Sequence, residues 1–397
     1  MTSGLNYNHT IKACFIGYIV QAIVNNFVPL LFLIFQSAYG IPLSKITLLI
    51  TFNFFIQLTV DFLSAGLIDR IGYRVSMVLA HLLSAAGLLL LAFLPAILPD
   101  PFAGLLLSVM IYAIGGGLLE VLVSPVVEAC PTDNKETAMS LLHSFYCWGH
   151  VGVILLSTLF FQVFGTGKWQ FLAVLWAMIP LLNCLLFLKV PIYSLHENED
   201  SESSLGALLS NKTFWIIFLL MICAGASEQA VSQWASAFAE AGLQVSKTVG
   251  DLAGPMFFAI LMGTSRAIYG KYGEKMDLNK FMKISSCLCI CSYLMISLSP
   301  WPILSLLGCG ICGLSVGILW PGTFSIAAKQ IPRGGTALFA LLALGGDVGC
   351  SGGPTLVGMI SSLFGGNLYR GILSTIIFPA LMLTGCYILK SPQERVK

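Results

Sequence analysis

The sequence predicts an all-α integral membrane protein with twelve transmembrane helices in two six-helix repeats. Of its 397 residues, 57% are hydrophobic and only 10% are charged, and the mean hydropathy is +0.89. Water-soluble domains carry roughly 25% charged residues. A helix that spans a membrane needs about 20 mainly apolar residues. The apolar residues of this chain are therefore enough for roughly twelve spans, and only short loops remain. A sizeable soluble domain is therefore excluded.

Gly, Pro and charged residues separate the apolar runs. The twelve expected spans are residues 10–36, 46–67, 75–98, 102–128, 137–163, 169–190, 213–238, 250–272, 280–299, 302–328, 336–363 and 370–390. The longest polar stretch, residues 191–212, follows the sixth span. We therefore expect an N-terminal six-helix bundle over 1–190, a cytoplasmic linker over 191–212 and a C-terminal six-helix bundle over 213–397.

The positive charges are distributed unevenly between alternate loops. If the N-terminus is cytoplasmic, 16 of the 20 Lys and Arg residues fall on the cytoplasmic side, and only Lys45, Lys168, Lys247 and Arg370 fall outside. Cytoplasmic loops of membrane proteins carry this excess. We expect a multi-pass protein of the plasma or inner cell membrane with both termini cytoplasmic. The first apolar run is too long for a cleavable signal peptide.

The two halves resemble each other at corresponding positions. Residues 137–142, at the start of the fifth span, have a sequence similar to residues 336–342, at the start of the eleventh. Each of these segments is followed by a Gly-x-Val-Gly segment. Gly-Leu precedes Pro by eight residues in the fourth span (Gly117, Pro125) and in the tenth (Gly313, Pro321). Two such repeats fit a transporter that works by alternating access, with its substrate held near the midplane.

The loop after the second span carries a family motif. Residues 65–74, Ala-Gly-Leu-Ile-Asp-Arg-Ile-Gly-Tyr-Arg, resemble the Gly-x-x-x-Asp-Arg-x-Gly-Arg-Arg signature of the major facilitator superfamily, and residues 266–273 resemble a degenerate copy. The motif departs from the signature at Ala65 and Tyr73. The resemblance implies the superfamily fold and a cytoplasmic gate, for which the candidates are Asp61, Asp69, Arg70, Arg74 and Arg266. The motif's glycine permits a tight turn.

Within that superfamily the chain looks most like the fucose permease group. The residues that carry this resemblance are Asn25-Asn26, Gly117 to Glu120 followed by Ser124-Pro125, and Trp320-Pro321. It implies that Glu120 is the carboxylate of proton-coupled sugar transport. The group's aspartate in the first helix falls on Pro29 here, so the chain departs from the group at that position.

Four of the carboxylates inside the expected spans are candidates for function. Charged residues in a span are costly and usually face a cavity or a partner. Glu120 and Glu228 lie deep in the fourth and seventh spans, where loss of water favours a neutral carboxyl suited to proton exchange. Asp347 is a third candidate for proton coupling, and it can instead bond a neighbouring backbone group or pair with Arg266. Asp61 lies nearer the cytoplasmic end of its helix.

Several helices carry polar stripes, because residues three or four apart share a helix face. The stripes are Tyr18, Gln21 and Asn25; Asn53, Gln57 and Asp61; and His143, Tyr146 and His150. For the second stripe we favour a hydrogen-bonded seam between helices. From the others, Gln21, Asn25, His143 and Tyr146 are candidates for substrate binding and His150 for proton coupling. Packing remains the alternative for each of them.

The seventh span brings Glu228, Gln229, Gln233 and Trp234 together in a short stretch. Amides and a carboxylate bind hydroxyl groups, and an aromatic ring stacks on a sugar ring. Trp320 in the tenth span is a second aromatic candidate. Because no Lys or Arg is expected near the midplane, these residues favour a neutral solute such as a sugar.

Three functions are compatible with the sequence. The favoured one is a proton-coupled importer of a sugar or similar small neutral polar solute, with H⁺ as coupling ion and Na⁺ as the alternative. The second is a proton-coupled antiporter that exports amphipathic or cationic compounds. Its support is the intramembrane carboxylates and the segment from Gly349 to Pro354, which resembles the Gly-Pro kink of antiporters. The third is a receptor or scaffold without transport.

An enzyme is not expected, because no nucleophile and base pair, metal set or phosphate loop stands out. The predicted partners are a small-molecule substrate and the lipid bilayer, with no nucleic acid, no cofactor and no bound metal. We expect the protein to be a monomer.

Overall fold

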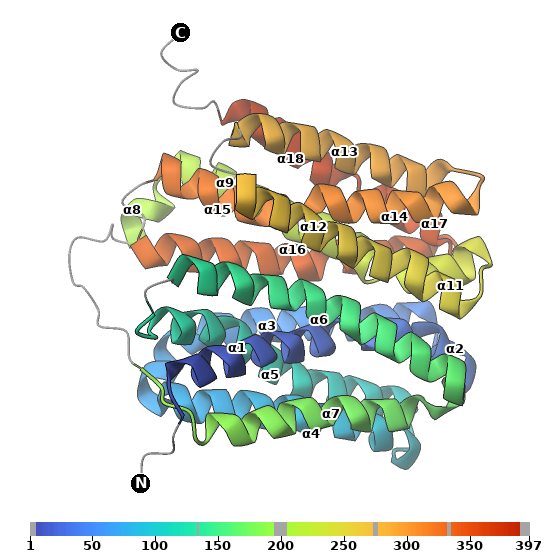
Figure 1. The fold of residues 1–397 in the computed structure, drawn as a ribbon. Helices are drawn as coiled ribbons and strands as arrows, with labels where there is room; N and C mark the ends of the chain where they lie inside the picture. The colour runs from blue at the N-terminus through green and yellow to red at the C-terminus, as the bar shows by residue number, and fades with distance from the viewer. Residues whose placement is uncertain (1–4, 133–134, 194–204, 273–276, 332–334, 390–397) are drawn as a thin grey trace. The chain divides into compact units, whose positions relative to one another are not determined.

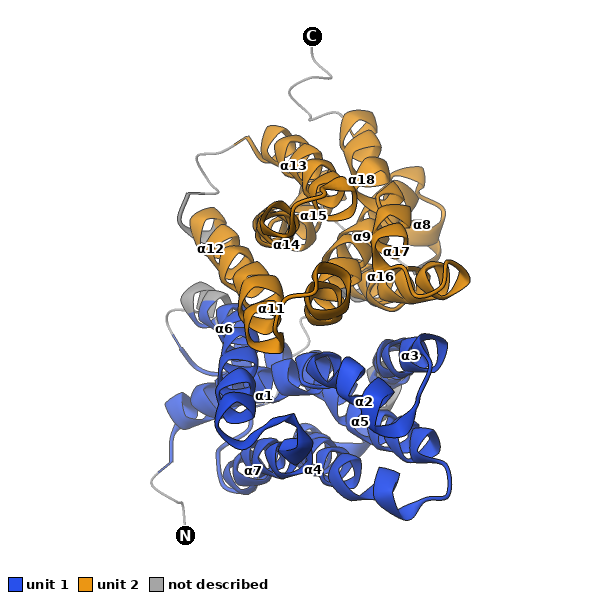
Figure 2. Ribbon diagram, turned by 90° about the vertical axis from the view of Figure 1, so that its right-hand side faces the viewer, with its two compact units in different colours: residues 1–197 blue, residues 198–397 orange. Residues whose placement is uncertain are grey.

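A computed structural model describes residues 5–132, 135–193, 205–272, 277–331 and 335–389. All regular secondary structure within these ranges is helical, as Figure 1 shows. The all-helical prediction is therefore confirmed. The chain divides into two compact units, residues 1–197 and 198–397, which Figure 2 colours separately. We call them the N-terminal and C-terminal units and describe each by itself.

The N-terminal unit contains long helices and two short 3₁₀ segments. They are α1 (Tyr7–Asn26), η1 (Val28–Leu31), α2 (Phe32–Tyr39), α3 (Leu43–Ile71), α4 (Tyr73–Ile97), α5 (Pro101–Glu128), α6 (Lys135–Phe164), η2 (Thr166–Lys168) and α7 (Trp169–Phe187). Helix α4 packs between α5 and α7, and α1 packs against α5 and α6.

The C-terminal unit has more interrupted helices. They are α8 (Leu205–Leu209), α9 (Lys212–Ser232), α10 (Ala235–Ala237), η3 (Phe238–Gly242), α11 (Lys247–Asp251), η4 (Leu252–Met256), α12 (Phe257–Tyr272), α13 (Leu278–Leu298), α14 (Pro302–Val316), α15 (Leu319–Gln330), α16 (Gly335–Leu363), α17 (Leu368–Ser374) and α18 (Ile377–Ile388). Here η3 and η4 are π-helical. The short helix α8 falls inside the expected linker 191–212.

Within the described residues, eleven helical stretches are long and apolar enough to span a membrane. The one expected span outside these eleven, 336–363, corresponds to α16 (Gly335–Leu363), which is 29 residues long. Its glycines and Asp347 lower its hydropathy. The two observations together agree with the predicted twelve-helix membrane fold.

Several predicted continuous spans are broken in the structure. The first runs from Tyr7 to Tyr39 but contains the 3₁₀ segment η1, with Pro29 inside it. Proline has no backbone N–H and cannot continue the hydrogen-bond ladder of an α-helix. The tenth span likewise changes from α14 to α15 around Gly317. These breaks leave backbone carbonyls for other partners within the bundle.

Polar residues between the spans begin the helices. The side chain of Asp100 accepts from the backbone N–H of Phe102 at 3.0 Å, at the start of α5. Asn211 accepts from Thr213 at 2.9 Å at the start of α9. Such caps satisfy backbone donors that lack a partner in the first turn of a helix. The short loops therefore have a direct role in setting where each span starts.

The motif loop after the second span is a tight turn. Helix α3 ends at Ile71 and α4 begins at Tyr73, so Gly72 alone connects them. Its φ is +88°, a left-handed conformation that favours glycine. The prediction that this glycine permits a tight turn is confirmed.

A buried histidine and an asparagine hold three helices of the N-terminal unit together. The side-chain Nδ2 of Asn183 on α7 lies 2.7 Å from Nε2 of His81 on α4 and 3.0 Å from the carbonyl of Ala13 on α1. The other ring nitrogen of His81 is 2.7 Å from the carbonyl of Met77. The ring thus donates at Nδ1 and accepts at Nε2, as a neutral histidine does.

In the C-terminal unit, α9 and α16 approach each other closely through glycines. A Cβ atom at Gly349 would overlap the backbone carbonyl of Ile222, and one at Gly353 would lie 2.6 Å from the carbonyl of Ala226. A small residue every four positions lets two membrane helices bring their backbones together. The glycines between Gly349 and Pro354 thus have a packing role between α9 and α16.

This contact predicts that Gly349→Ala destabilises the protein. The added methyl group must push α9 and α16 apart, and overpacking of this kind costs about 1–3 kcal/mol. The melting temperature of the purified protein in detergent should fall measurably. Gly352→Ala is the matched control, because a Cβ atom there meets nothing within 4 Å. Equal melting temperatures for the two variants would contradict the packing model.

Candidate functional site

The polar contact of most interest in the N-terminal unit joins α1 to α5. The side-chain Nε2 of Gln21 donates a 2.8 Å hydrogen bond to Oε2 of Glu120. Gln21 is 3% exposed and Glu120 is partly buried. Along the same face, the hydroxyl of Tyr18 lies 3.0 Å from the hydroxyl of Ser124. Gln21 and Glu120 were both predicted as binding residues, and the structure brings them into direct contact.

A cluster of buried amides joins α1 to α3. The side-chain oxygen of Asn25 accepts a hydrogen bond from Gln57 at 2.8 Å and another from Asn53 at 3.2 Å. All three side chains are buried. The stripe of Asn53 and Gln57 therefore forms a seam between helices, as the sequence indicated. Their partner, Asn25, could not be identified from spacing within one helix.

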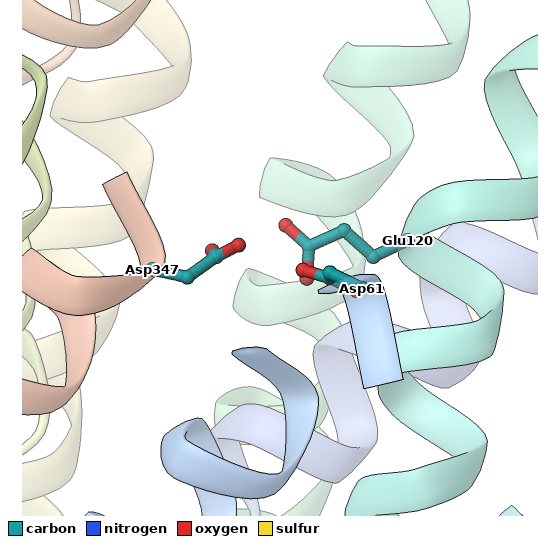
Figure 3. Close-up of side chains that lie close together, drawn as sticks. All are labelled: Asp61, Glu120 and Asp347. Atoms are coloured by element: carbon teal, nitrogen blue, oxygen red, sulfur yellow. The ribbon is translucent and has the colours of Figure 1, made fainter. Parts of the chain in front are cut away.

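Asp61, on α3, points toward Glu120. One carboxylate oxygen of Asp61 lies within 4.8 Å of one from Glu120, and Figure 3 shows the two side chains close together. Both residues are partly buried. Two carboxylates this close repel each other when both are ionised. The structure thus joins a predicted gate residue to a predicted proton-coupling residue.

The polar stripe on α6 contains residues in different environments. His143 is exposed, and its ring centroid lies 5.5 Å from that of Tyr18. Tyr146 is half-buried, whereas His150 is only 3% exposed. His143 therefore lies beside the Tyr18 end of the α1 stripe.

An ion pair crosses the C-terminal unit between α9 and α12. The Nη2 atom of Arg266 lies 3.1 Å from Oε2 of Glu228, and the two side chains are 22% and 9% exposed. The Nε–H of Arg266 also points to the carbonyl of Gly317 at 3.4 Å, where α14 ends. Glu228 is 17 residues into the span Lys212–Gly242. The expectation that no cation approaches the middle of a span was therefore wrong, because the long side chain of Arg266 reaches Glu228.

The glutamines of α9 continue this network. The Nε2 of Gln229 donates to Oε1 of Glu228 at 3.3 Å, and the Nε2 of Gln233 donates to Oε1 of Gln229 at 3.0 Å. Both glutamines are buried. Arg266, Glu228 and the two amides therefore form one connected chain of polar groups, in which each predicted binding residue orients the next.

The two tryptophans have different surroundings. Trp234 is fully buried, and its indole N–H donates to the carbonyl of Pro354 at 2.9 Å. Its predicted role as a stacking surface for substrate is not supported by this packing position. Trp320 is half-buried, and a Cβ atom at Gly346 would overlap its ring. The absence of a side chain at Gly346 therefore makes room for the indole of Trp320 beside α16. The adjacent Asp347 is 5% exposed.

The predicted gate residues near the motif loop occupy separate positions. The Nη1 of Arg74 donates to the carbonyl of Phe187 at 2.8 Å, so Arg74 caps the end of α7. Arg70 is exposed. The side chain of Asp69 lies outside the described residues. Arg266, the remaining candidate, takes part in the ion pair with Glu228.

The sequence model of the Major Facilitator Superfamily matches residues 14–354, which is most of the chain. The chain belongs to the major facilitator superfamily. Members of this superfamily are transporters, so the protein is a membrane transporter and not an enzyme. Comparison with curated protein sequences gives no match.

Two kinds of solved superfamily structure share the fold over nearly the whole chain. A point variant of the Escherichia coli fucose:proton symporter FucP is 16% identical with a TM-score of 0.66, covering 97% of this chain and 100% of that one. A bacterial homologue of the human lysosomal transporter Spinster, inward-facing and unoccupied, is 14% identical with a TM-score of 0.79, covering 98% and 100%. At these identities the likeness establishes the superfamily fold. The predicted resemblance to a fucose permease is thereby confirmed at the level of fold.

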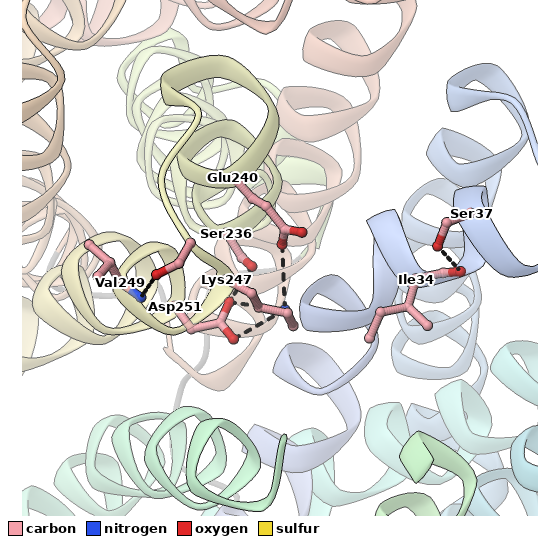
Figure 4. Close-up of polar contacts among 8 residues, drawn as sticks. Ile34, Ser37, Ser236, Glu240, Lys247, Val249 and Asp251 are labelled. Carbon is pink, nitrogen blue, oxygen red and sulfur yellow. Dashed lines mark hydrogen bonds and ion pairs between the residues drawn. The ribbon is translucent and has the colours of Figure 1, made fainter. Parts of the chain in front are cut away.

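One charged cluster was missed by sequence reasoning. Lys247 on α11 lies 3.1 Å from the fully buried carboxylate of Asp251 and 4.0 Å from that of Glu240. The hydroxyl of Ser236 donates to Asp251, and Figure 4 shows these four side chains converging. The spacing of four between Lys247 and Asp251 was a usable signal for their pairing. The contacts across α10, η3 and α11 were not predictable from that spacing.

The Glu228–Arg266 pair predicts a specific stability pattern. Glu228→Gln leaves the half-buried guanidinium of Arg266 without its counter-charge, and breaking a buried pair in this way costs about 3–5 kcal/mol. The melting temperature of the purified protein should fall. In the double variant Glu228→Gln with Arg266→Met, the unpaired charge is gone and the melting temperature should recover. A double variant no more stable than Glu228→Gln alone would contradict this account.

Proposed function

We propose that the protein is a proton-coupled importer of a sugar or a similar small neutral polar solute, working by alternating access. The observation that carries this proposal is the contact between Gln21 and Glu120. It joins a carboxylate inside a span to an amide that binds hydroxyl groups. Carboxylates within transmembrane helices mark ion pathways and proton relays.

Substrate contacts in the N-terminal unit are assigned to Gln21, Asn25 and Glu120, with His143 and Tyr146 beside them. Amides supply both donors and acceptors, as the hydroxyl groups of a sugar require. Gln21 and Glu120 are already aligned by their mutual hydrogen bond, and Gln57 orients Asn25. Polar groups oriented in advance lose less freedom when a ligand binds.

In the C-terminal unit, the proposed contacts are Glu228, Gln229, Gln233 and Trp320. The chain of hydrogen bonds from Arg266 to Gln233 orients these polar groups. The ring of Trp320 is half-buried and can contribute an aromatic face. Because Glu228 compensates the charge of Arg266, the pair as a whole still fits a neutral solute better than an anion.

For proton coupling we place Glu120 first and Glu228 second, with His150 and Asp347 as further candidates. Protonation of Glu228 would break its ion pair with Arg266, whereas Gln21 is an uncharged partner of Glu120. The fold shared with a structure described as a fucose:proton symporter supports both the sugar and the proton. Na⁺ is the alternative coupling ion.

The proposal also covers the orientation of the chain in the membrane and its oligomeric state. The excess of Lys and Arg in alternate loops supports cytoplasmic termini in a cell membrane. Asp61, Asp69, Arg70, Arg74 and Arg266 are retained as the proposed cytoplasmic gate. We propose that the transporter works as a monomer.

The competing function is a proton-coupled antiporter for amphipathic or cationic compounds. Its support is the pair of carboxylates on α3 and α5, which would attract a cation. Two observations weigh against it. The glycines of α16 are explained by contact with α9, and the charge of Glu228 is compensated by Arg266.

The direction and substrate class are tested by adding solutes to de-energised cells that express the protein. A proton symporter should make the outside medium more alkaline when its sugar is added. Lipophilic cations form the second panel. Proton movement with cations and silence with every sugar would support the antiporter and reject the importer.

The role of Glu120 is tested by Glu120→Gln, which keeps the size and most hydrogen bonds but cannot ionise. Uphill uptake should be abolished, while exchange of labelled for unlabelled solute should persist in part. The control is Glu240→Gln, a carboxylate outside the proposed route, which should accumulate solute normally. Unchanged accumulation in Glu120→Gln would remove this residue from coupling.

A further inference from the structure

The break between α14 and α15 lies where a backbone donor is missing. In a continuous α-helix, the carbonyl of Gly317 would accept from the N–H of the residue four positions later, but that residue is Pro321, which has no N–H. Ladder bonds are present on either side. Gly317 donates to the carbonyl of Gly313 at 3.2 Å, and Gly322 donates to that of Ile318 at 2.7 Å. The carbonyl of Gly317 is therefore left without its usual helical donor.

A side chain from α12 supplies a donor at this place. The Nε–H of Arg266 donates to the carbonyl of Gly317 at 3.4 Å, while Nη2 of the same guanidinium lies 3.1 Å from Oε2 of Glu228 on α9. A positive charge at the C-terminal end of a helix is favourable, because the last carbonyls carry partial negative charge. The helices also touch here, since a Cβ atom at Gly317 would lie 2.7 Å from the Cβ of Ser265. One guanidinium therefore links α12 to both α9 and the end of α14.

Trp320 follows this carbonyl by three residues, in the first turn of α15. A proline inside a span interrupts the ladder and allows the helix to bend, so contacts with neighbouring helices decide the direction in which α15 leaves α14. The ring of Trp320 lies beside Gly346 on α16, where a Cβ atom would overlap it. Because this space is narrow, the place of the ring depends on the direction of α15.

Helix α12 also contacts α15 on the other side of Trp320. The hydroxyl of Tyr269, three residues after Arg266, donates to the hydroxyl of Ser325 at 3.1 Å. Ser325 in turn donates to the carbonyl of Pro321 at 3.0 Å. The two contacts from α12 thus fall three residues before Trp320 and five residues after it.

We propose that Arg266 is the positioning residue for Trp320: its Nε–H replaces the backbone donor that Pro321 lacks, and so fixes the direction of α15 and the place of the indole ring. The inference rests on the proposed function in one respect, namely that Trp320 is part of the substrate site. It deepens that function, because one guanidinium orients both the amides of α9, through Glu228, and the aromatic ring of α15. Arg266 thereby acts inside the bundle, in addition to its proposed place in the gate.

The test separates the Nε donor of Arg266 from its charge. Arg266→Lys keeps a positive charge beside Glu228, but one ammonium group cannot occupy both the Nε and the Nη2 positions. The indole is followed by ¹⁹F NMR of the protein labelled with 5-fluorotryptophan and purified in detergent. The resonance of Trp320 is the one of seven that disappears in Trp320→Phe. Arg266→Lys should shift this resonance and leave that of Trp169, in the N-terminal unit, unchanged.

The deciding measurement repeats Arg266→Lys in a protein that carries Pro321→Ala. Alanine restores an N–H that can bond to the carbonyl of Gly317, so the donor from α12 is no longer needed. The shift caused by Arg266→Lys should then be about threefold smaller or less, as expected for two coupled sites. Pro125→Ala is the matched control, because Pro125 is also half-buried and holds the corresponding place in the first repeat. In that background the shift should keep its full size.

Each variant is first shown to melt cooperatively. An unchanged Trp320 resonance in Arg266→Lys overturns the inference, and so does a shift of equal size with Pro321 and with Pro321→Ala. If Arg266→Lys does not fold, the double variant Glu228→Gln with Arg266→Met replaces it, because it removes the donor without leaving an unpaired charge. The same shift, and the same reduction in the Pro321→Ala background, are then expected.

The outcome is separable from that of the proposed function, because the resonances are recorded without any solute. Once a transported sugar is known, Arg266→Lys should weaken its binding several-fold, and Pro321→Ala should reduce that loss. A Trp320 shift that depends on Pro321, in a protein that takes up no sugar, would support the positioning of Trp320 and reject the importer. Proton-driven sugar uptake with a shift that is independent of Pro321 would do the reverse.

Discussion

The fold depends on one constraint: polar groups inside a bundle that spans a membrane must find partners within the protein. In the N-terminal unit, Asn183 satisfies both His81 and a carbonyl of α1, and Gln21 bonds to Glu120. In the C-terminal unit, Arg266 meets Glu228 and a carbonyl at the end of α14. Each contact joins different helices, so satisfying the polar groups also determines which helix faces meet.

Close packing by glycine makes some of these contacts possible. The small residues of α16 allow it to lie against the backbone of α9, and Gly117 allows α5 to approach α3. Breaks at Pro29 and near Gly317 interrupt the helical ladder, and the carbonyl of Gly317 accepts from Arg266. In transporters with inverted repeats, discontinuous helices commonly line the substrate site. Rigid seams and interrupted helices therefore occur together in this protein.

The sequence predicted which residues belong to the candidate site better than it predicted the contacts between them. Gln21, Asn25 and Glu120 stand out because polar residues are rare inside spans, and their spacing places the first two on one face. Spacing within one helix says nothing about its neighbours, so the bond from Gln21 to Glu120 and the approach of Asp61 appear only in the structure. Arg266 was placed too near the loop, because a long side chain can reach several ångströms from its own Cα.

The sequence by itself determined the class of protein, because runs of about 20 apolar residues with few charges recur along the whole chain, as in membrane-spanning helices. Its motif loop indicated the superfamily, since those residues are consecutive in the chain. Only the tertiary structure decided that the indole of Trp234 donates to a carbonyl of α16, that Arg266 pairs with Glu228, and that Asp61 and Glu120 meet. These are contacts between residues far apart in sequence, and they depend on how the helices pack against one another.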